Sequence, residues 1–517
     1  MRQQVWASII GRFALVISAV YLYGCAASQQ VKPAPLTATV RDEMVAPAGD
    51  ELNLPWQATE GASAENWQAQ QRNFLTLLAD DANHVDAHSQ LAELYFKQYI
   101  IAKNADFKRW ALYHAQKALA TKPQDLTLLA AYYRLLYTQV RMEGEKTQLA
   151  RLQTFYKGLP SDARNSFFPP SLAFYLFLLE QDKNNRDNSR RAELKAVLQQ
   201  ALKEQPRNGL IHVQLSRYYF DARQIDVGFA ILHQALHLEP ENPQVVLALA
   251  EAYRTRAQRT ECVYDHLDDI KRSTQFYKQL LTQPASNDDT RTPPTHMPQV
   301  HWGLMINYAH LGLAPLSIRE GDQAMTADAS ALNKWIFATY LTYQNQPVRA
   351  EALFATAKQQ LPIIPTRAAV EHYVLQRQWQ KAAQAFADYI ADNEQPGVTD
   401  LLLASMIQAE IQDKSVTVAS LWRTPKKAVF YNSFDEALAK FWRGDLTEAA
   451  FAEQIKSPCQ QAEYEFYVGY LHLLNNRVGK AKEAFELASK HPQPMNFEVQ
   501  MAARFLQGLL NNPKNRS

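Results

Sequence analysis

Hydrophobic residues recur at intervals of three and four positions along most of the chain, from about residue 70 to residue 510. This period places apolar side chains on one face of an α-helix, whereas strict alternation would indicate a strand. The apolar segments come in pairs separated by short polar turns. We therefore predict an all-α fold built from successive helical hairpins.

The hairpins repeat with a fixed spacing, most clearly in GLIHVQLSRYYFDARQIDVGFAILHQALHLEPENPQ, residues 209–244. Small residues at Ser216, Gly228 and Ala235 would let two helices cross closely. Large residues at Leu215, Tyr219 and Leu232 would fill the space between the helices. Pro240 would end the second helix. The next helix repeats the pattern 34 positions further on, at Leu249, Ala250 and Tyr253.

Similar spacings recur near residues 91–123, 304–324, 337–362, 369–386 and 468–488. The pattern resembles the tetratricopeptide repeat (TPR), a helix-turn-helix unit of about 34 residues. One such unit cannot bury its own apolar face, so the units must stack. The resemblance implies a superhelical α-solenoid. Residues 140–195 and 395–450 keep the helical period but lose the repeat spacing.

The N-terminus combines two arginines, Arg2 and Arg12, with an apolar run from Phe13 to Tyr23. This run is shorter than the roughly 20 residues that a membrane-spanning helix needs. Leu22-Tyr23-Gly24-Cys25 resembles the lipobox of bacterial lipoproteins, and that resemblance implies cleavage before Cys25, a diacylglyceryl group on its sulfur and acylation (palmitate) of its new amine. Ala26 makes the outer membrane the expected destination, facing the periplasm. An uncleaved signal anchor is the alternative.

The domain boundaries follow from these patterns. We expect a signal peptide at 1–24 and a lipidated N-terminus with a flexible tether at 25–67, rich in Ala, Gln, Pro and Thr. An N-terminal repeat block would cover 68–285 and a C-terminal block 300–510. Between them SNDDTRTPPTHMPQ, residues 286–299, predicts a loop or hinge, because adjacent prolines disfavour helix. Residues 511–517 would form a tail.

Charge and motifs exclude several function classes. The formal net charge of +2 lies entirely before Cys25, in Arg2 and Arg12, so the remaining chain is neutral and gives no reason to propose a nucleic-acid partner. No metalloprotease, Walker, dinucleotide or nucleophile-elbow motif occurs. We expect no cofactor. The pairs His84/His88 and His233/His237 have a metal-ligand spacing, but their repeat positions favour structural roles.

Two cysteines follow the lipobox, Cys262 and Cys459. An oxidising periplasm would allow a disulfide between them. In a solenoid, however, contacts form mostly between neighbouring repeats, and these cysteines lie far apart in sequence. We therefore expect free thiols, with a disulfide as the alternative.

The TPR resemblance implies that first helices line a concave, partner-binding groove. Aromatic and arginine side chains dominate binding hot spots. The candidates on first helices are Arg217, Phe220, Glu251, Arg254, Trp302, Trp335, Tyr343, Arg367, Glu371, Phe466 and Tyr470.

The sequence thus favours a non-enzymatic scaffold or adaptor that binds protein partners in envelope assembly, as a peptidoglycan-enzyme adaptor or in a pilotin-like role. A polysaccharide-export or glycan-binding component is one alternative. An enzyme with a site in the insertion Arg256–Asp269 is another.

Overall fold

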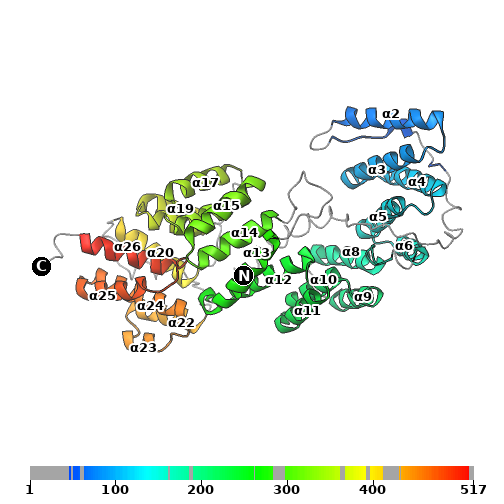
Figure 1. Cartoon of the computed structure of the whole chain (residues 1–517). Coiled ribbons are helices and arrows are strands. Elements are labelled where there is room, and N and C mark those ends of the chain that lie inside the picture. The colour runs from blue at the N-terminus through cyan, green and yellow to red at the C-terminus, as the bar shows by residue number, and fades with distance from the viewer. Residues whose placement is uncertain are drawn as a thin grey trace. The chain divides into compact units, whose positions relative to one another are not determined.

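The computed structural model describes residues 46–47, 51–58, 63–160, 164–185, 190–260, 262–282, 297–360, 367–391, 396–411, 430 and 432–511. Its regular elements there are all helices, which confirms the all-α solenoid prediction (Figure 1). The predicted signal peptide 1–24, Cys25 and most of the tether lie outside the described residues. Among the helices that are described, none combines the length and apolarity needed to cross a membrane.

The chain divides into two compact units, one ending at Val245 and the other beginning, for the described residues, at Val246. Helices of the N-terminal unit follow a short 3-10 turn, η2 (Glu51–Asn53). They are α2 (Ala64–Asp80), α3 (Val85–Ala102), α4 (Ala105–Thr121), α5 (Leu126–Glu143), α6 (Lys146–Gly158), α8 (Pro170–Asn185), α9 (Arg191–Glu204), α10 (Gly209–Asp221) and α11 (Ile225–Leu238).

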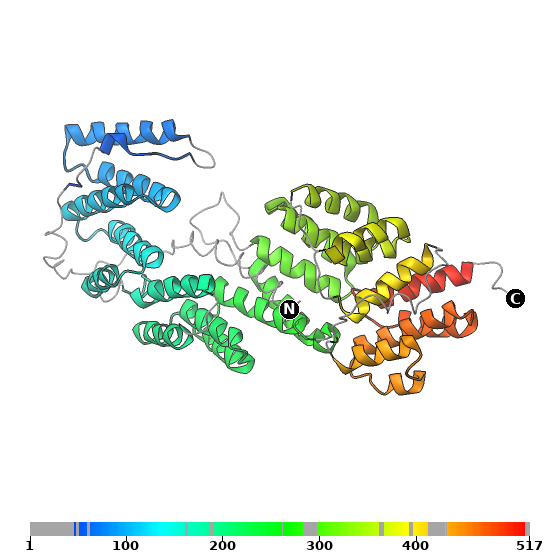
Figure 2. The ribbon, with the colours of Figure 1, turned by 180° about the vertical axis from the view of Figure 1, so that it is seen from behind.

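The C-terminal unit takes in most of α12 (Pro243–Gln258), the 3-10 helix η4 (Val263–His266) and α13 (Leu267–Thr282). It continues with α14 (Met297–His310), α15 (Ala314–Ala327), α16 (Ala331–Tyr343), α17 (Pro347–Gln360), α18 (Arg367–Leu375), α19 (Trp379–Ala391) and α20 (Val398–Glu410). It ends with α22 (Ser433–Arg443), α23 (Glu448–Ala452), α24 (Pro458–Leu474), α25 (Val478–Ser489) and α26 (Phe497–Asn511). Seen from behind in Figure 2, both units again consist of packed helices joined by short turns.

The division between the units does not fall at the predicted hinge 286–299. Helix α13, before that stretch, packs on α14, after it: Asn307 Nδ2 donates to Ser273 Oγ at 2.9 Å. This buried bond joins the two helices into one unit. Residues 283–296 lie outside the described residues, and α14 already begins at Met297. The described compact units instead divide between Val245 and Val246, and the loop or hinge at 286–299 stays a prediction.

Small residues lie where helices cross closely, both within a hairpin (α10 with α11) and between successive hairpins (α15 with α16). A Cβ built on Gly228 of α11 would lie 2.4 Å from the ring of Phe220 of α10, and one on Gly321 of α15 would lie 2.3 Å from Phe337 of α16. Both distances are too short for real contacts. Any larger residue at either glycine would push the two helices apart.

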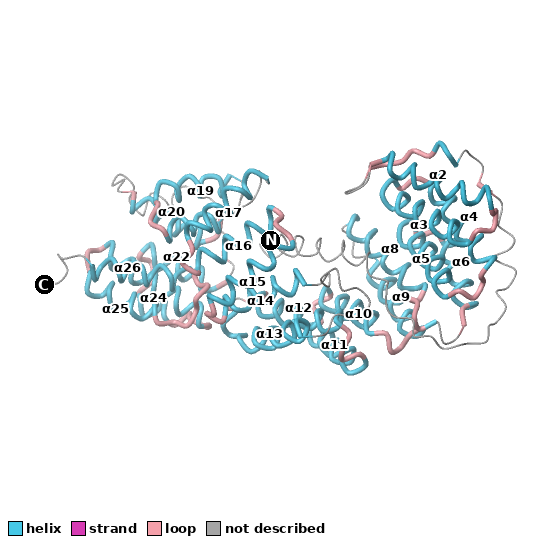
Figure 3. Tube along the Cα trace, turned by 45° about the horizontal axis from the view of Figure 1, so that its top comes forward, coloured by secondary structure: helices cyan, strands magenta, loops and turns pink. Residues whose placement is uncertain are grey.

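The end of the predicted tether is ordered. In residues 51–57, η2 is followed by an extended stretch in which Leu54 and Trp56 are buried in the N-terminal core. In Figure 3 the loop that precedes α2, coloured pink, runs beside that helix. A segment that buries two large apolar side chains is held in place, so residues 51–57 do not behave as a flexible tether.

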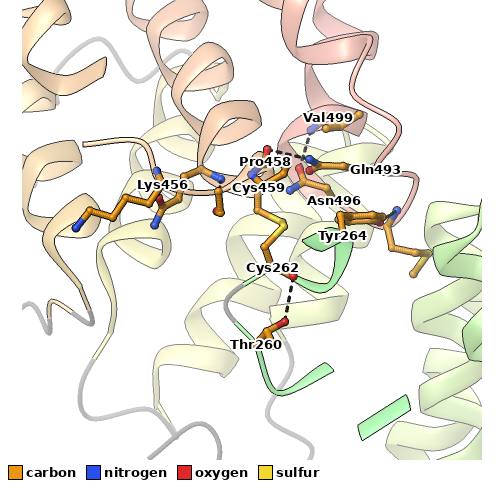
Figure 4. The surroundings of a disulfide bond; sticks show 12 residues. Thr260, Cys262, Tyr264, Lys456, Pro458, Cys459, Gln493, Asn496 and Val499 are labelled. Carbon is orange, nitrogen blue, oxygen red and sulfur yellow. Dashed lines mark hydrogen bonds between the residues drawn. A yellow bond between two sulfur atoms is a disulfide. The ribbon is translucent and has the colours of Figure 1, made fainter. Parts of the chain in front are cut away.

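Cys262 and Cys459 form a disulfide, contrary to the expectation of free thiols (Figure 4). Their Cα atoms are 5.6 Å apart although 197 residues separate them in sequence. The backbone amide of Met495 donates to Tyr264 Oη at 2.9 Å, beside the disulfide. The expectation was wrong because the array of helices from α12 to α26 turns back on itself, so that η4 lies against α24.

Loss of the disulfide should destabilise the C-terminal unit. A cross-link that closes so long a loop restricts the unfolded chain, so Cys262→Ser/Cys459→Ser should lower the free energy of unfolding by about 2 to 5 kcal/mol. Urea unfolding followed by circular dichroism measures this. Reductant should shift the wild-type midpoint to that of the variant and leave the variant unchanged.

Non-reducing peptide mapping by mass spectrometry supplies the independent check. It should find a cross-linked peptide that contains Cys262 and Cys459. Separate peptides with both thiols free, together with a wild-type midpoint insensitive to reductant, would contradict the bond.

Candidate functional site

The candidate site is the side of the C-terminal unit on which polar side chains of α16, α18 and α20 meet, here called the inner side. At its centre Arg367, the first residue of α18, donates from Nε to Glu371 Oε1 at 2.7 Å and from Nη1 to Asp400 Oδ1 at 2.6 Å. Arg367 Nη1 also donates to Thr399 Oγ1 at 2.9 Å. One guanidinium thus joins α18 to the start of α20.

Two tyrosines extend this cluster to neighbouring helices. Tyr343, the last residue of α16, donates its hydroxyl to Glu371 Oε2 at 2.6 Å. Tyr467 of α24 donates to Glu498 Oε1 of α26 at 3.2 Å. We call Tyr343, Arg367, Glu371, Asp400, Tyr467 and Glu498 the arginine cluster.

The arginine cluster lies in a region of low polarity. Burial opposes the charge of Arg367, but Asp400 and Glu371 outweigh this effect and raise the pKa of the guanidinium. Burial raises the pKa of Glu498, and Arg367 opposes the rise only in part. A carboxyl with a raised pKa holds a proton more readily, which limits the negative charge that one arginine must balance.

A second polar group surrounds Arg254 of α12. Its Nε donates to Tyr277 Oη of α13 at 3.3 Å and its Nη1 donates to Gln258 Oε1 at 3.0 Å. The ring of His310, the last residue of α14, lies edge-on to Tyr264 and to Tyr340, with centroids 6.1 and 6.4 Å away. Burial, with a smaller contribution from Arg254, lowers the pKa of His310 to about 4.

The structure places the predicted groove residues in different surroundings. Trp335, Phe466 and Tyr470 are core residues with 7%, 0% and 1% of their surface exposed, so they offer no surface to a partner here. Phe220 packs on Gly228 inside its own hairpin. Trp302 is half-buried and packs against the hydrophobic core. These five aromatics therefore serve packing in this structure.

The other six predicted residues are half-buried. Tyr343, Arg367 and Glu371 meet in the arginine cluster, and Glu251 acts on the charge of Arg254. Arg217, in the N-terminal unit, lies near Tyr175 and opposes the rise of that tyrosine's pKa. The structure thus brings five of them together as two groups on α12, α16 and α18.

The sequence interpretation missed several residues of these groups. Asp400 could have been found, because a carboxylate three residues into a helix often accepts from the cap backbone, and its Oδ2 accepts from Gly397 N at 2.9 Å. Glu498, Tyr277 and His310 carry no such local signal. They join the site only through the packing of distant helices.

The insertion Arg256–Asp269 is engaged in structural contacts. Arg256 Nε and Nη2 donate to the two carboxylate oxygens of Asp269, both at 2.6 Å, and Cys262 is in the disulfide. Within the described residues no group of three or more His, Cys, Asp or Glu side chains is arranged to hold a metal ion.

Comparison with known proteins adds the following. No family model and no curated protein matches the chain. Solved structures that match include YrrB, a TPR protein with an unusual peptide-binding site (13% identity, 41% of this chain and 97% of that one, TM-score 0.31). Another is PilW, a type IV pilus biogenesis factor (16%, 47% and 95%, 0.32). A third is a TPR protein from Parabacteroides merdae (12%, 62% and 99%, 0.31). These likenesses concern the fold alone.

Removal of the central cation should destabilise the C-terminal unit strongly. Arg367→Met leaves Asp400 and Glu371 buried without their partner, which should lower the free energy of unfolding by about 3 to 5 kcal/mol. The control is Lys358→Met, which breaks the exposed pair with Asp388 and should cost at most about 1 kcal/mol. Equal urea midpoints for the two variants would refute the central role of Arg367.

Acid should weaken the C-terminal unit through His310. Because its folded pKa is about 4 and its unfolded pKa about 6.5, the unfolded state binds the extra proton between these values. This contribution to stability is complete above pH 6.5 and is lost as pH falls toward 4, by roughly 2 kcal/mol between pH 7 and 5. His310→Phe should remove that part of the pH dependence of urea unfolding. Parallel pH profiles for both proteins would contradict this assignment.

Proposed function

We propose that the chain is a non-enzymatic scaffold that binds protein partners in the bacterial cell envelope, anchored to the outer membrane by lipid on Cys25. The observation that carries the scaffold role is the stack of helical hairpins, in which α12, α16 and α18 gather Glu251, Arg254, Tyr343, Arg367 and Glu371 in two polar groups. Such arrays offer extended binding surfaces.

Two features support the envelope location. The motif that ends in Cys25 resembles a lipobox, and Cys262 is bonded to Cys459. Disulfides persist in the periplasm and are rare in the reducing cytosol. An adaptor for peptidoglycan enzymes or a pilotin-like role fits this location.

Site-specific photo-crosslinking in intact cells tests the scaffold role. A photo-reactive residue at Glu251 or Arg254, both half-buried on the first helix α12, should capture the same protein partner, identified by mass spectrometry. Val348 and Leu487, 80% and 54% exposed on second helices, are the control positions. Capture only from the control positions would overturn the inner-side assignment, and capture of glycan would favour the glycan-binding alternative.

The anchor is tested separately by Cys25→Ser. This variant should remain unprocessed or leave the membrane fraction, because its side chain lacks the thiol that is lipidated. Cell fractionation and intact-mass measurement give the result. Normal processing with unchanged membrane retention would refute lipidation at Cys25.

A further inference from the structure

The segment Glu51–Gln57 lies against the first three helices as the 3-10 turn η2 followed by an extended stretch. In the extended stretch Leu54 and Trp56 are buried, and their neighbours Asn53, Pro55 and Gln57 are exposed; Leu52, in the turn, is 56% exposed. Gln71 of α2 donates directly to Tyr95 Oη of α3 at 3.0 Å, so α2 and α3 contact each other without the segment. The surface formed by α2, α3 and α4 under the segment is named the N-terminal face.

The N-terminal face holds the carboxylate of Glu51 in a built site. Tyr95 Oη donates to Glu51 Oε1 at 2.7 Å, and His114 Nε2 of α4 lies 2.6 Å from the same oxygen. Burial, followed by Glu51, raises the pKa of Tyr95, which keeps the hydroxyl a donor. His114 Nδ1 is in turn 2.7 Å from His88 Nδ1. The face therefore offers donors that are already oriented for a carboxylate.

Gln98 of α3 holds the backbone at the other end of the segment. Its Oε1 accepts from Gln57 N at 3.0 Å, and its Nε2 donates to Gln57 O at 2.9 Å. Both bonds use only main-chain groups of Gln57, so they would form with any residue other than proline at that position. Such a clamp recognises an extended chain by its backbone.

Between these two ends the face has an aromatic slot. The ring of Trp56 lies edge-on to Phe107 of α4, with centroids 5.0 Å apart, and 5.7 Å from Tyr95. The indole Nε1 of Trp56 is buried and has no hydrogen-bond partner within the described structure. A buried donor without a partner weakens the hold of the slot on this residue. The segment therefore fits the face well in shape and imperfectly in hydrogen bonding.

We propose that the N-terminal face is a docking site for an extended partner peptide, and that residues 51–57 are an internal ligand that masks it. The partner peptide would carry a carboxylate, a leucine-sized residue three positions later and an aromatic residue two positions after that. This inference rests on the proposed binding function and names the class of partner.

The segment masks the N-terminal face effectively because it is covalently connected to α2. Only a few residues separate Gln57 from Ser63, which caps α2. A short tether holds its ligand at an effective concentration of order millimolar. A free peptide of the same affinity at micromolar concentration therefore cannot displace the segment from the wild-type chain.

The test uses the full processed chain and a fluorescein-labelled peptide, GDELNLPWQA, that reproduces residues 49–58. Glu51→Gln/Trp56→Ala weakens the internal ligand and leaves the face intact, so this variant should bind the peptide at least tenfold more tightly than wild type. Adding Gln98→Ala should abolish the gain. Fluorescence anisotropy measures all three, and circular dichroism confirms that each is folded.

Two matched controls sharpen the result. Leu52→Ala changes an exposed side chain of the same segment and should bind the peptide as weakly as wild type. A peptide with Gln and Ala at the positions of Glu51 and Trp56 should not bind the double variant. If the double variant does not fold, Glu51→Gln alone replaces it, with an expected gain of several-fold.

A folded variant that binds no peptide, or binds it equally with and without Gln98→Ala, overturns the docking site. So does wild type binding the peptide as tightly as the double variant. These outcomes leave the scaffold role standing if Glu251 and Arg254 still capture a partner in cells. Failure of that crosslinking alone would instead remove the inner-side assignment and leave the N-terminal face.

Discussion

The C-terminal unit depends on one contact between segments that are far apart in sequence, the disulfide of Cys262 with Cys459. A solenoid of hairpins normally contacts only neighbouring repeats, and its inner side stays open to water. Here η4 and α24 are bonded, and α18 contacts α26 near the end of the unit. Burial within the unit raises the pKa of Glu498 and lowers that of His310, whereas Asp400 and Glu371 raise the pKa of Arg367 against the effect of burial.

The need to cover apolar surface also shapes the start of the N-terminal unit. A terminal hairpin has no preceding repeat to cover its apolar face, so something else must cover it. Residues 51–57 do so with Leu54, Trp56 and a carboxylate bonded to Tyr95. The two units thus cover their surfaces in different ways, one with a covalent bond and the other with a short segment held by side-chain contacts.

Much of the fold could be predicted from the sequence, because the helices and their pairing follow from short-range periodic patterns of hydrophobic and small residues. Each of these patterns can be recognised within one or two helices: the three-and-four spacing, the 34-residue repeat and the small residues at helix crossings. Contacts at long range carry no such signal. Nothing near Cys262 indicates that α24 would return to it, and nothing near Arg367 indicates Glu498.

The segment 51–57 is a different case, since a local signal was present. ELNLPW places two leucines and a tryptophan in a stretch otherwise rich in Ala, Gln, Pro and Thr. Overall composition predicted a tether, but alternating apolar residues indicate a chain with one side packed. Composition averages over a segment, whereas packing depends on the positions of a few residues.

The inner side of the C-terminal unit and the N-terminal face differ in which groups already satisfy their hydrogen-bond donors, and this difference affects where a partner could bind. On the inner side of the C-terminal unit Arg367 already satisfies Glu371 and Asp400, so a ligand that engaged it would first have to break buried ion pairs. On the N-terminal face the donors of Tyr95, His114 and Gln98 also have acceptors, but these belong to a peptide-like segment. Exchange of that segment for a similar peptide conserves every hydrogen bond. A partner peptide with the same chemistry as residues 51–57 would therefore bind at a lower desolvation cost on the N-terminal face than on the inner side of the C-terminal unit.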